Sequence, residues 1–161
     1  GAEFGPAKRW PHYHYAELAK QLIDEGYQVV LFGSAKDHEA GNEILAALNT
    51  EQQAWCRNLA GETQLDQAVI LIAACKAIVT NDSGLMHVAA ALNRPLVALY
   101  GPSSPDFTPP LSHKARVIRL ITGYHKVRKG DAAEGYHQSL IDITPQRVLE
   151  ELNALLLQEE A

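Results

Sequence analysis

Residues 78–91 constrain the fold more than any other stretch of the chain. They read Ile-Val-Thr-Asn-Asp-Ser-Gly-Leu-Met-His-Val-Ala-Ala-Ala. The apolar, largely β-branched residues 77–80 predict a buried strand, and residues 81–84 are turn and cap types in a row. Residues 85–92 predict an alanine-rich helix that is apolar nearly all round and therefore buried. The chain is thus expected to pass directly from a strand into a helix.

A helix that follows a strand so closely offers a site for an anion. Its first N–H groups lack intrahelical partners, and its dipole adds positive potential. Gly84 lets a ligand approach the backbone, and His87, one turn later, leans back toward the helix start. Asp82 would repel an anion, so we expect it to accept hydrogen bonds from ligand hydroxyls or to cap the helix. Together these residues point to a ligand that carries phosphate and hydroxyl groups, such as a nucleotide sugar.

The same residues have simpler interpretations, which the sequence leaves open. Asp82 or Ser83 is then only an N-cap. Gly84 eases packing, and His87 is a core histidine with satisfied hydrogen bonds.

The rest of the chain alternates strand and helix patterns. Such alternation predicts a parallel sheet covered by helices on both faces, with ligand-binding loops 33–34, 81–84 and 101–104 gathered at the strand ends. Leu65, Ala68, Val69 and Ile72 form the expected inward face of one helix. Strands are predicted at 28–32, 55–59, 77–80, 96–100 and 116–121, and helices at 10–26, 37–48, 65–75, 85–92 and from 144.

Composition narrows the class of protein. The chain has 161 residues and a formal net charge of −5, which disfavours a general nucleic-acid or membrane surface. Length suits one domain, 1–161. No stretch is long enough to span a bilayer, and Cys56 and Cys75 are read as reduced, buried thiols of a cytosolic protein. Residues 1–6 look like a loop whose preceding strand has been cut away, so we expect the chain to be one half of a larger protein.

Two further candidates have open interpretations. Lys8 lies just before a predicted helix. Its side chain either binds an anion there or is solvated. Glu39, in the first turn of another predicted helix, accepts hydrogen bonds from a ribose or only suits the helix dipole. A third feature, the basic cluster of Lys126, Arg128 and Lys129, is a solvated loop or a contact for acceptor phosphates.

Three segments together resemble one family. Residues 82–91, the segment Lys8-Arg9-Trp10-Pro11 and the segment Leu99-Tyr100-Gly101-Pro102 are similar, in order and spacing, to motifs of the bacterial heptosyltransferases. These are glycosyltransferases of GT-B type, with two Rossmann-like domains and the active site between them. The resemblance implies that this chain is the C-terminal, donor-binding domain, and that an N-terminal domain outside it supplies the acceptor site and the general base.

The resemblance also implies roles for particular residues. Lys8 would hold the donor diphosphate and stabilise the departing ADP, and Glu39 would bind the ribose. The family's diphosphate and sugar contacts fall on Asp82, Ser83, Gly84 and His87. The adenine pocket would be lined by backbone of Thr63, Gln64 and Leu65.

The implied reaction is inverting transfer of heptose from ADP-heptose to the first heptose of the lipopolysaccharide inner core. No cofactor or metal is expected, since the chain has no Asp-x-Asp motif. The implied location is the cytoplasm, at the cytosolic face of the inner membrane, which only the full-length enzyme would contact. A nucleotide-sugar epimerase domain and a non-catalytic nucleotide-binding module remain alternatives. A serine hydrolase is disfavoured, because residues 81–84 are not a G-x-S-x-G elbow.

Overall fold

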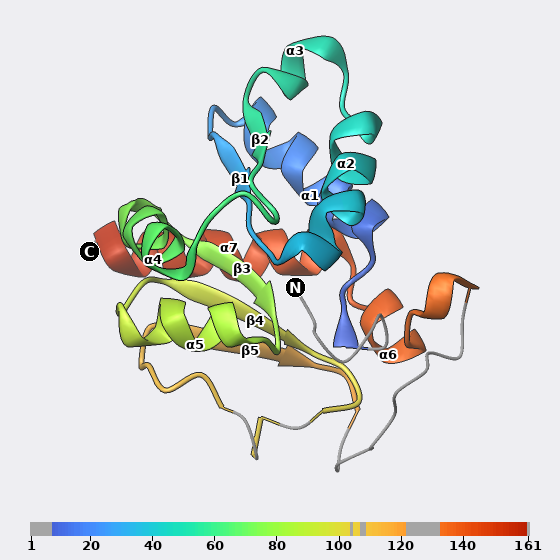
Figure 1. Cartoon of the computed structure of the whole chain (residues 1–161). Helices are drawn as coiled ribbons and strands as arrows, with labels where there is room; N and C mark the ends of the chain where they lie inside the picture. The colour runs from blue at the N-terminus through green and yellow to red at the C-terminus, as the bar shows by residue number, and fades with distance from the viewer. Residues whose placement is uncertain (1–7, 104, 107–108, 122–132, 161) are drawn as a thin grey trace.

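The computed structural model describes residues 8–103, 105–106, 109–121 and 133–160 (Figure 1). The predicted alternation of strands and helices is confirmed. The five strands are β1 (Val29–Leu31), β2 (Cys56–Asn58), β3 (Ile78–Asn81), β4 (Leu96–Tyr100) and β5 (Ala115–Arg119). The longer helices are α1 (His12–Asp24), α2 (His38–Ala47), α4 (Leu65–Ala74), α5 (Gly84–Ala91) and α7 (Pro145–Glu160). Short helices complete the list: η2 (Ala35–Asp37), α3 (Thr50–Gln53), η3 (Ala133–Gly135) and α6 (Gln138–Ile141).

The strands form two parallel sheets rather than one. β1 pairs with β2, and β3, β4 and β5 pair in that order. In Figure 1 the first sheet lies with α1–α3 in the upper part, and the second lies with α5 and α7 below. The predicted parallel pairing is confirmed, and within the described residues it is divided between two sheets because β1 and β3 do not hydrogen-bond to each other.

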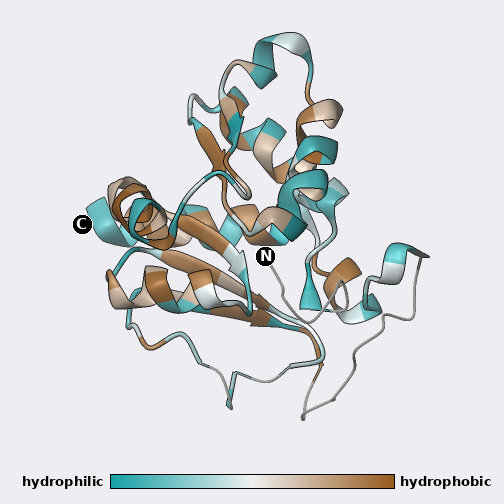
Figure 2. Ribbon diagram, viewed as in Figure 1, coloured by the Kyte–Doolittle hydropathy of each residue, from teal (hydrophilic) through white to brown (hydrophobic). Residues whose placement is uncertain are grey.

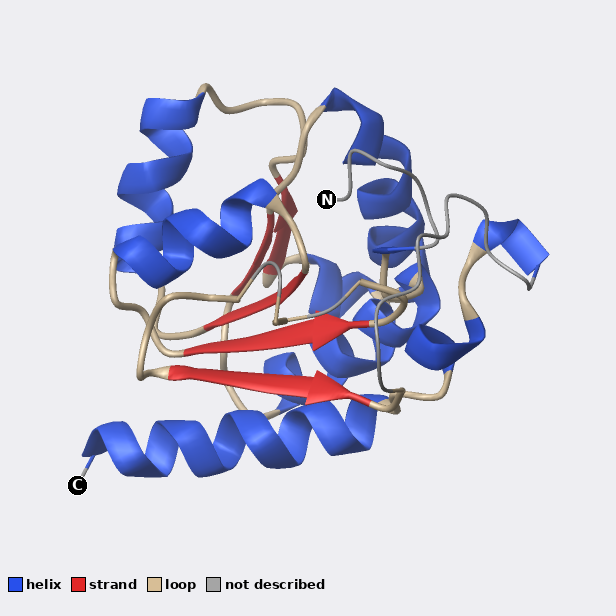
Figure 3. Cartoon of the chain, turned by 90° about the horizontal axis from the view of Figure 1, so that it is seen from below, coloured by secondary structure: helices blue, strands red, loops and turns tan. Residues whose placement is uncertain are grey.

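Strand β4 is the centre of the larger sheet, and all of its residues are buried. Its side chains alternate between two cores, as the two-residue period of a strand requires. Val97 and Leu99 pack in a cluster that includes Leu152 of α7, whereas Ala98 packs in a cluster with Met86 of α5. Figure 3 shows α7 running beside these strands, and Figure 2 shows apolar residues concentrated along them. The predicted cover of helices on both faces is confirmed for this sheet.

Two predictions about helix burial are wrong. Helix α5 buries Met86, Ala89 and Ala90 but exposes Gly84, His87 and Ala91, which share one face because they are three and four residues apart. An apolar composition concealed this exposed face, since alanine and glycine suit either environment.

Leu65 of α4 is the second exception, with 68% of its surface exposed. It continues the face of Ala68 and Ile72, which are buried. Leu65 is the first residue of the helix, and burial along this face starts at Ala68. None of the helices in the described ranges is long and apolar enough to cross a membrane.

Candidate functional site

The turn between β3 and α5 has the predicted form. Ser83 is the N-cap of α5, and its hydroxyl oxygen accepts a hydrogen bond of 3.4 Å from the Met86 amide. The Thr80 hydroxyl donates to the carbonyl of Asn81 at 2.9 Å. Of the two candidate caps, Ser83 is therefore the actual one.

Lys8 and Asp82 are far apart in the sequence but lie close together in the fold. The Nζ atom of Lys8 lies 3.9 Å from a carboxylate oxygen of Asp82. The Asp82 side chain is 7% exposed and the Lys8 side chain 26% exposed, so the carboxylate is buried and the lysine is partly accessible to solvent. Because Asp82 directly precedes the cap of α5, the ammonium group stands next to the start of that helix.

Gly84 is not required by packing. A Cβ atom built on it meets nothing within 4 Å among the described residues, and its φ angle is not in the left-handed region. Packing within the described residues therefore does not require glycine at this position, and the role of Gly84 in ligand binding stays a prediction. His87 is exposed on the same face, so the interpretation of His87 as a core histidine is wrong.

The loop that carries Lys8 is fixed by the next residues. Trp10 is fully buried, and its indole N–H donates to the carbonyl of Ile143 at 2.9 Å. Its backbone N–H donates to Oδ1 of Asn81 at 2.8 Å. The hydroxyl of Tyr15 donates to the same oxygen at 2.7 Å, and burial raises the pKa of Tyr15, which keeps this hydroxyl protonated as a donor.

Arg9 ties the same loop to the other sheet. Its guanidinium lies 2.9 Å from Oδ1 of Asp37 in the η2 turn, which follows β1. The second oxygen of Asp37 accepts a hydrogen bond from the Ser34 amide at 2.8 Å. Gly33 makes this arrangement possible, since a Cβ there would lie 2.6 Å from the Asp37 side chain. The loops after β1 and β3 therefore meet through residues 8–10, as expected for the carboxyl ends of parallel strands.

The remaining predicted residues lie on other elements. Glu39 is exposed in the first turn of α2, and Thr63, Gln64 and Leu65 form the start of α4. No hydrogen bond or ion pair described in the structure joins these residues to Lys8 or Asp82. Their ribose and adenine roles stay predictions, and the basic cluster 126–129 lies outside the described residues.

Sequence reasoning missed several residues that build the site, namely Arg9, Asp37 and Asn81. Arg9 stands beside Lys8, and Asp37 follows Ser34 by three residues in the spacing of a cap. Asn81 falls in the predicted ligand-binding loop 81–84, but the sequence assigns no role to its side chain. Local signals thus existed for Asp37, but the partners of Arg9 and Asn81 are distant in sequence.

Comparison with known proteins identifies the family. The model of glycosyltransferase family 9 (heptosyltransferase) matches residues 1–137. This chain belongs to glycosyltransferase family 9. It is 94% identical over 159 residues to lipopolysaccharide heptosyltransferase 2 of Salmonella typhimurium, covering 99% of this chain and 46% of the relative. The chain thus spans about half the length of this relative.

Solved structures agree with this family 9 assignment. The structure of E. coli ADP-heptose lipopolysaccharide heptosyltransferase II superposes with a TM-score of 0.92 and 94% identity, covering 100% of this chain and 46% of that one. E. coli heptosyltransferase WaaC with ADP-2-deoxy-2-fluoro heptose gives a TM-score of 0.66 and 25% identity, covering 96% of this chain and 40% of that one. The predicted α/β fold of GT-B type is therefore confirmed.

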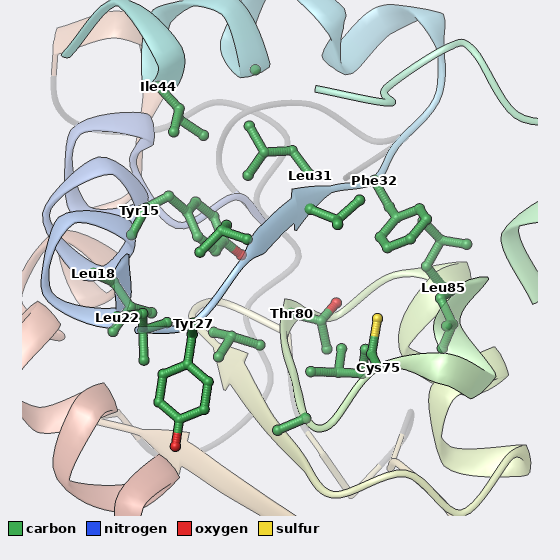
Figure 4. Close-up of a pocket in the computed structure, with 18 of the residues that line it drawn as sticks. Tyr15, Leu18, Leu22, Tyr27, Leu31, Phe32, Ile44, Cys75, Thr80 and Leu85 are labelled. Atoms are coloured by element: carbon green, nitrogen blue, oxygen red, sulfur yellow. The ribbon is translucent and has the colours of Figure 1, made fainter. Parts of the chain in front are cut away.

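This family 9 chain also has a large apolar cavity, whose lining reaches the site at Arg9, Asp37 and Asn81. The cavity measures about 550 Å³ and lies between the two sheets, lined by residues 28–32 around β1 and residues 76–81 around β3. Figure 4 shows Leu18 and Leu22 of α1 on one side and Thr80 on another. None of the residues predicted to bind a ligand lines it. An apolar lining does not compensate for the desolvation of a diphosphate, so we do not assign this cavity to the donor.

Within the described parts of this family 9 chain, no group of three or more His, Cys, Asp or Glu side chains could hold a metal ion. Cys56 and Cys75 are both free thiols. Cys56 is buried as predicted, whereas Cys75, at the end of α4, is only partly buried. The prediction that both cysteines are buried is correct for Cys56 alone.

Proposed function

We propose that this chain is the donor-binding half of an inverting heptosyltransferase, which moves heptose from ADP-heptose to the first heptose of the lipopolysaccharide inner core. The observation that carries the proposal is the Lys8–Asp82 pair, 3.9 Å apart at the open start of α5. The Salmonella relative named above is a heptosyltransferase, which supports sugar transfer over epimerisation or nucleotide sensing.

The donor diphosphate would bind between Lys8 and the first turn of α5. The ammonium of Lys8 carries the compensating charge, and amide groups at the helix start donate hydrogen bonds. The contact of 3.9 Å to Asp82 is long for an ion pair, so a phosphate oxygen can replace the carboxylate beside Lys8. Asp82, Ser83 and His87 would then face the sugar hydroxyls, and Gly84 would leave room for the approach.

The chemical step follows from this placement. An acceptor hydroxyl loses its proton to a base, and its oxygen attacks the anomeric carbon from the face opposite ADP. The new carbon–oxygen bond forms as the bond to the diphosphate breaks, so negative charge grows on the leaving ADP. Lys8 and the start of α5 offset that charge, which is where preorganised donors contribute most to the rate.

The base and the acceptor site would come from an N-terminal domain outside this chain. The chain by itself would then bind the donor weakly and transfer nothing, because closure of two domains assembles the site and excludes water. In the cell, we place the full-length enzyme in the cytoplasm at the cytosolic face of the inner membrane. No metal or cofactor enters the proposed step.

The test uses the full-length protein with ADP-heptose, with and without the lipopolysaccharide acceptor and without added metal. Release of ADP that depends on the acceptor supports transfer. A changed sugar on the nucleotide in the absence of acceptor would instead identify an epimerase. Binding of ADP and ATP as tight as that of ADP-heptose, without turnover, would identify a nucleotide sensor.

A further inference from the structure

A single side-chain oxygen of Asn81 accepts hydrogen bonds from two segments of the chain. Asn81 is the last residue of β3 and is 1% exposed. Its Oδ1 accepts the backbone N–H of Trp10 at 2.8 Å and the hydroxyl of Tyr15 at 2.7 Å. A carbonyl oxygen has two lone pairs, so these two hydrogen bonds use the full accepting capacity of that atom.

We infer that Asn81 is a positioning residue for Lys8, an inference that rests on the proposed role of Lys8 in binding the diphosphate. Lys8 lies two residues before Trp10, so a fixed Trp10 amide restricts the Lys8 backbone to within about 7 Å of that point. Asp82, the partner of Lys8, directly follows Asn81 in the sequence. One carboxamide therefore fixes both members of the pair relative to each other.

The hydrogen bond from the Trp10 amide explains why a side chain with a carbonyl oxygen occupies position 81. The amide of Trp10 is buried, and a buried N–H without a partner is costly. Replacing Asn81 by leucine keeps a similar volume but removes the acceptor. The segment 8–10 would then shift to find another partner, and Lys8 would move away from the start of α5.

Tyr15 provides a matched control, because it shares the same acceptor atom. In Tyr15→Phe the second hydrogen bond to Oδ1 is lost, while the bond from Trp10 remains. Tyr15 lies on α1 and is seven residues from Lys8, so this variant removes one hydrogen bond to Asn81 without removing the Trp10 hydrogen bond that restrains the Lys8 segment.

The experiment measures kcat and KM of full-length enzyme in five forms: the parent, Asn81→Leu, Lys8→Ala, the double variant of these two, and Tyr15→Phe. Asn81→Ala is the substitute if the leucine variant does not fold. We expect Asn81→Leu to lower kcat at least tenfold with a smaller change in KM. In the Lys8→Ala background the same change should have at most a twofold effect, because interacting sites are not additive. Tyr15→Phe should keep kcat within twofold of the parent.

A second readout separates this inference from the proposed function. The rate at which an amine-specific reagent modifies Lys8, followed by mass spectrometry, should change at least threefold in Asn81→Leu. It should stay unchanged in Tyr15→Phe. Changed Lys8 reactivity together with a fully active Lys8→Ala enzyme would support the positioning and contradict the catalytic role. Unchanged reactivity, or an additive double variant, would overturn the positioning role of Asn81.

Discussion

The backbone N–H of Trp10 donates a hydrogen bond of 2.8 Å to the side-chain oxygen of Asn81, which is 71 positions away in the sequence. This contact joins the segment that carries Lys8 to the turn that carries Asp82. The indole of Trp10 is also fully buried and bonded to the carbonyl of Ile143. The same residue therefore supports both the site and the core.

Trp10→Ala should lower the free energy of unfolding by about 3–5 kcal/mol, the usual cost of truncating a buried tryptophan. Urea denaturation of the chain, followed by circular dichroism, measures the change. Trp55→Ala is the matched control, because Trp55 is 47% exposed and exposed substitutions usually change stability by less than about 0.5 kcal/mol. Equal losses in both variants would contradict the anchoring role of Trp10.

Lys8→Ala in the full-length enzyme should reduce kcat by about 10²–10³, the typical loss on removing one preorganised charge-stabilising donor. ADP release under saturating donor and acceptor measures it. Lys20→Ala serves as the control, since Lys20 pairs with Glu17 on the surface of α1 at 3.2 Å. Near-parent turnover in Lys8→Ala would remove Lys8 from the mechanism.

Calorimetric titration of this chain with ADP, ADP-heptose, UDP and GDP, without metal, tests the location of the donor site. Selective binding of the two adenine ligands, with ADP-heptose weakened in Asp82→Ala, is the expected result, because the carboxylate would accept hydrogen bonds from the sugar. Asp66→Ala, in the first turn of α4, is the control for the loss of one carboxylate. Equal binding of all the nucleotides would indicate a generic phosphate site and argue against a heptose donor.

The cavity between the sheets predicts that a further parallel strand adds to this chain. Within the described residues, β1 and β3 each pair on only one edge, and the apolar cavity separates them. Val30 in β1 is 38% exposed, whereas every residue of β4 is buried between two neighbouring strands. Helix α1 covers the cavity, but no strand in the described residues precedes that helix.

An N-terminal extension of about ten residues, taken from the sequence that precedes Gly1 in a full-length enzyme, should fill this space. We expect a rise of several degrees in the unfolding temperature, at about 2–4 °C for each kcal/mol gained. Amide exchange should slow in β1 and β3. The control extension carries proline at alternate positions, because proline cannot donate to a strand ladder. Equal amide protection with both extensions would exclude strand addition.

The free energy of unfolding should decrease in alkaline solution. Burial raises the pKa of the Cys56 thiol from 9.0 to about 11, so the unfolded chain loses this proton at a lower pH than the folded chain. The contribution of Cys56 is therefore complete below pH 9.0 and decreases as the pH rises toward about 11. Urea midpoints across this range should decline less steeply in Cys56→Ala than in the parent. Parallel slopes in the two proteins would show that another group, such as the buried Tyr15, causes the decline.

The sequence alone predicted most of the local structure. The β3–α5 turn was found from residues 77–92 because each of its signals is local: a β-branched run, a row of turn residues and an alanine-rich helix. The five strands and five long helices follow from equally local patterns. The motifs at residues 8–11, 82–91 and 99–102 were sufficient to predict the family, because motifs and their order along the chain are read directly from the sequence.

Tertiary structure decided which of these elements touch. The division into two sheets depends on which strand edges meet, and hydrophobic periodicity says nothing about that. The exposed face of α5 depends on what packs against it, because alanine is suited to either environment. Asn81, Arg9 and Asp37 acquire their roles from partners up to 71 positions away. The sequence determined the residues available for the proposed diphosphate site, and only folding determined that Lys8 and Asp82 lie 3.9 Å apart.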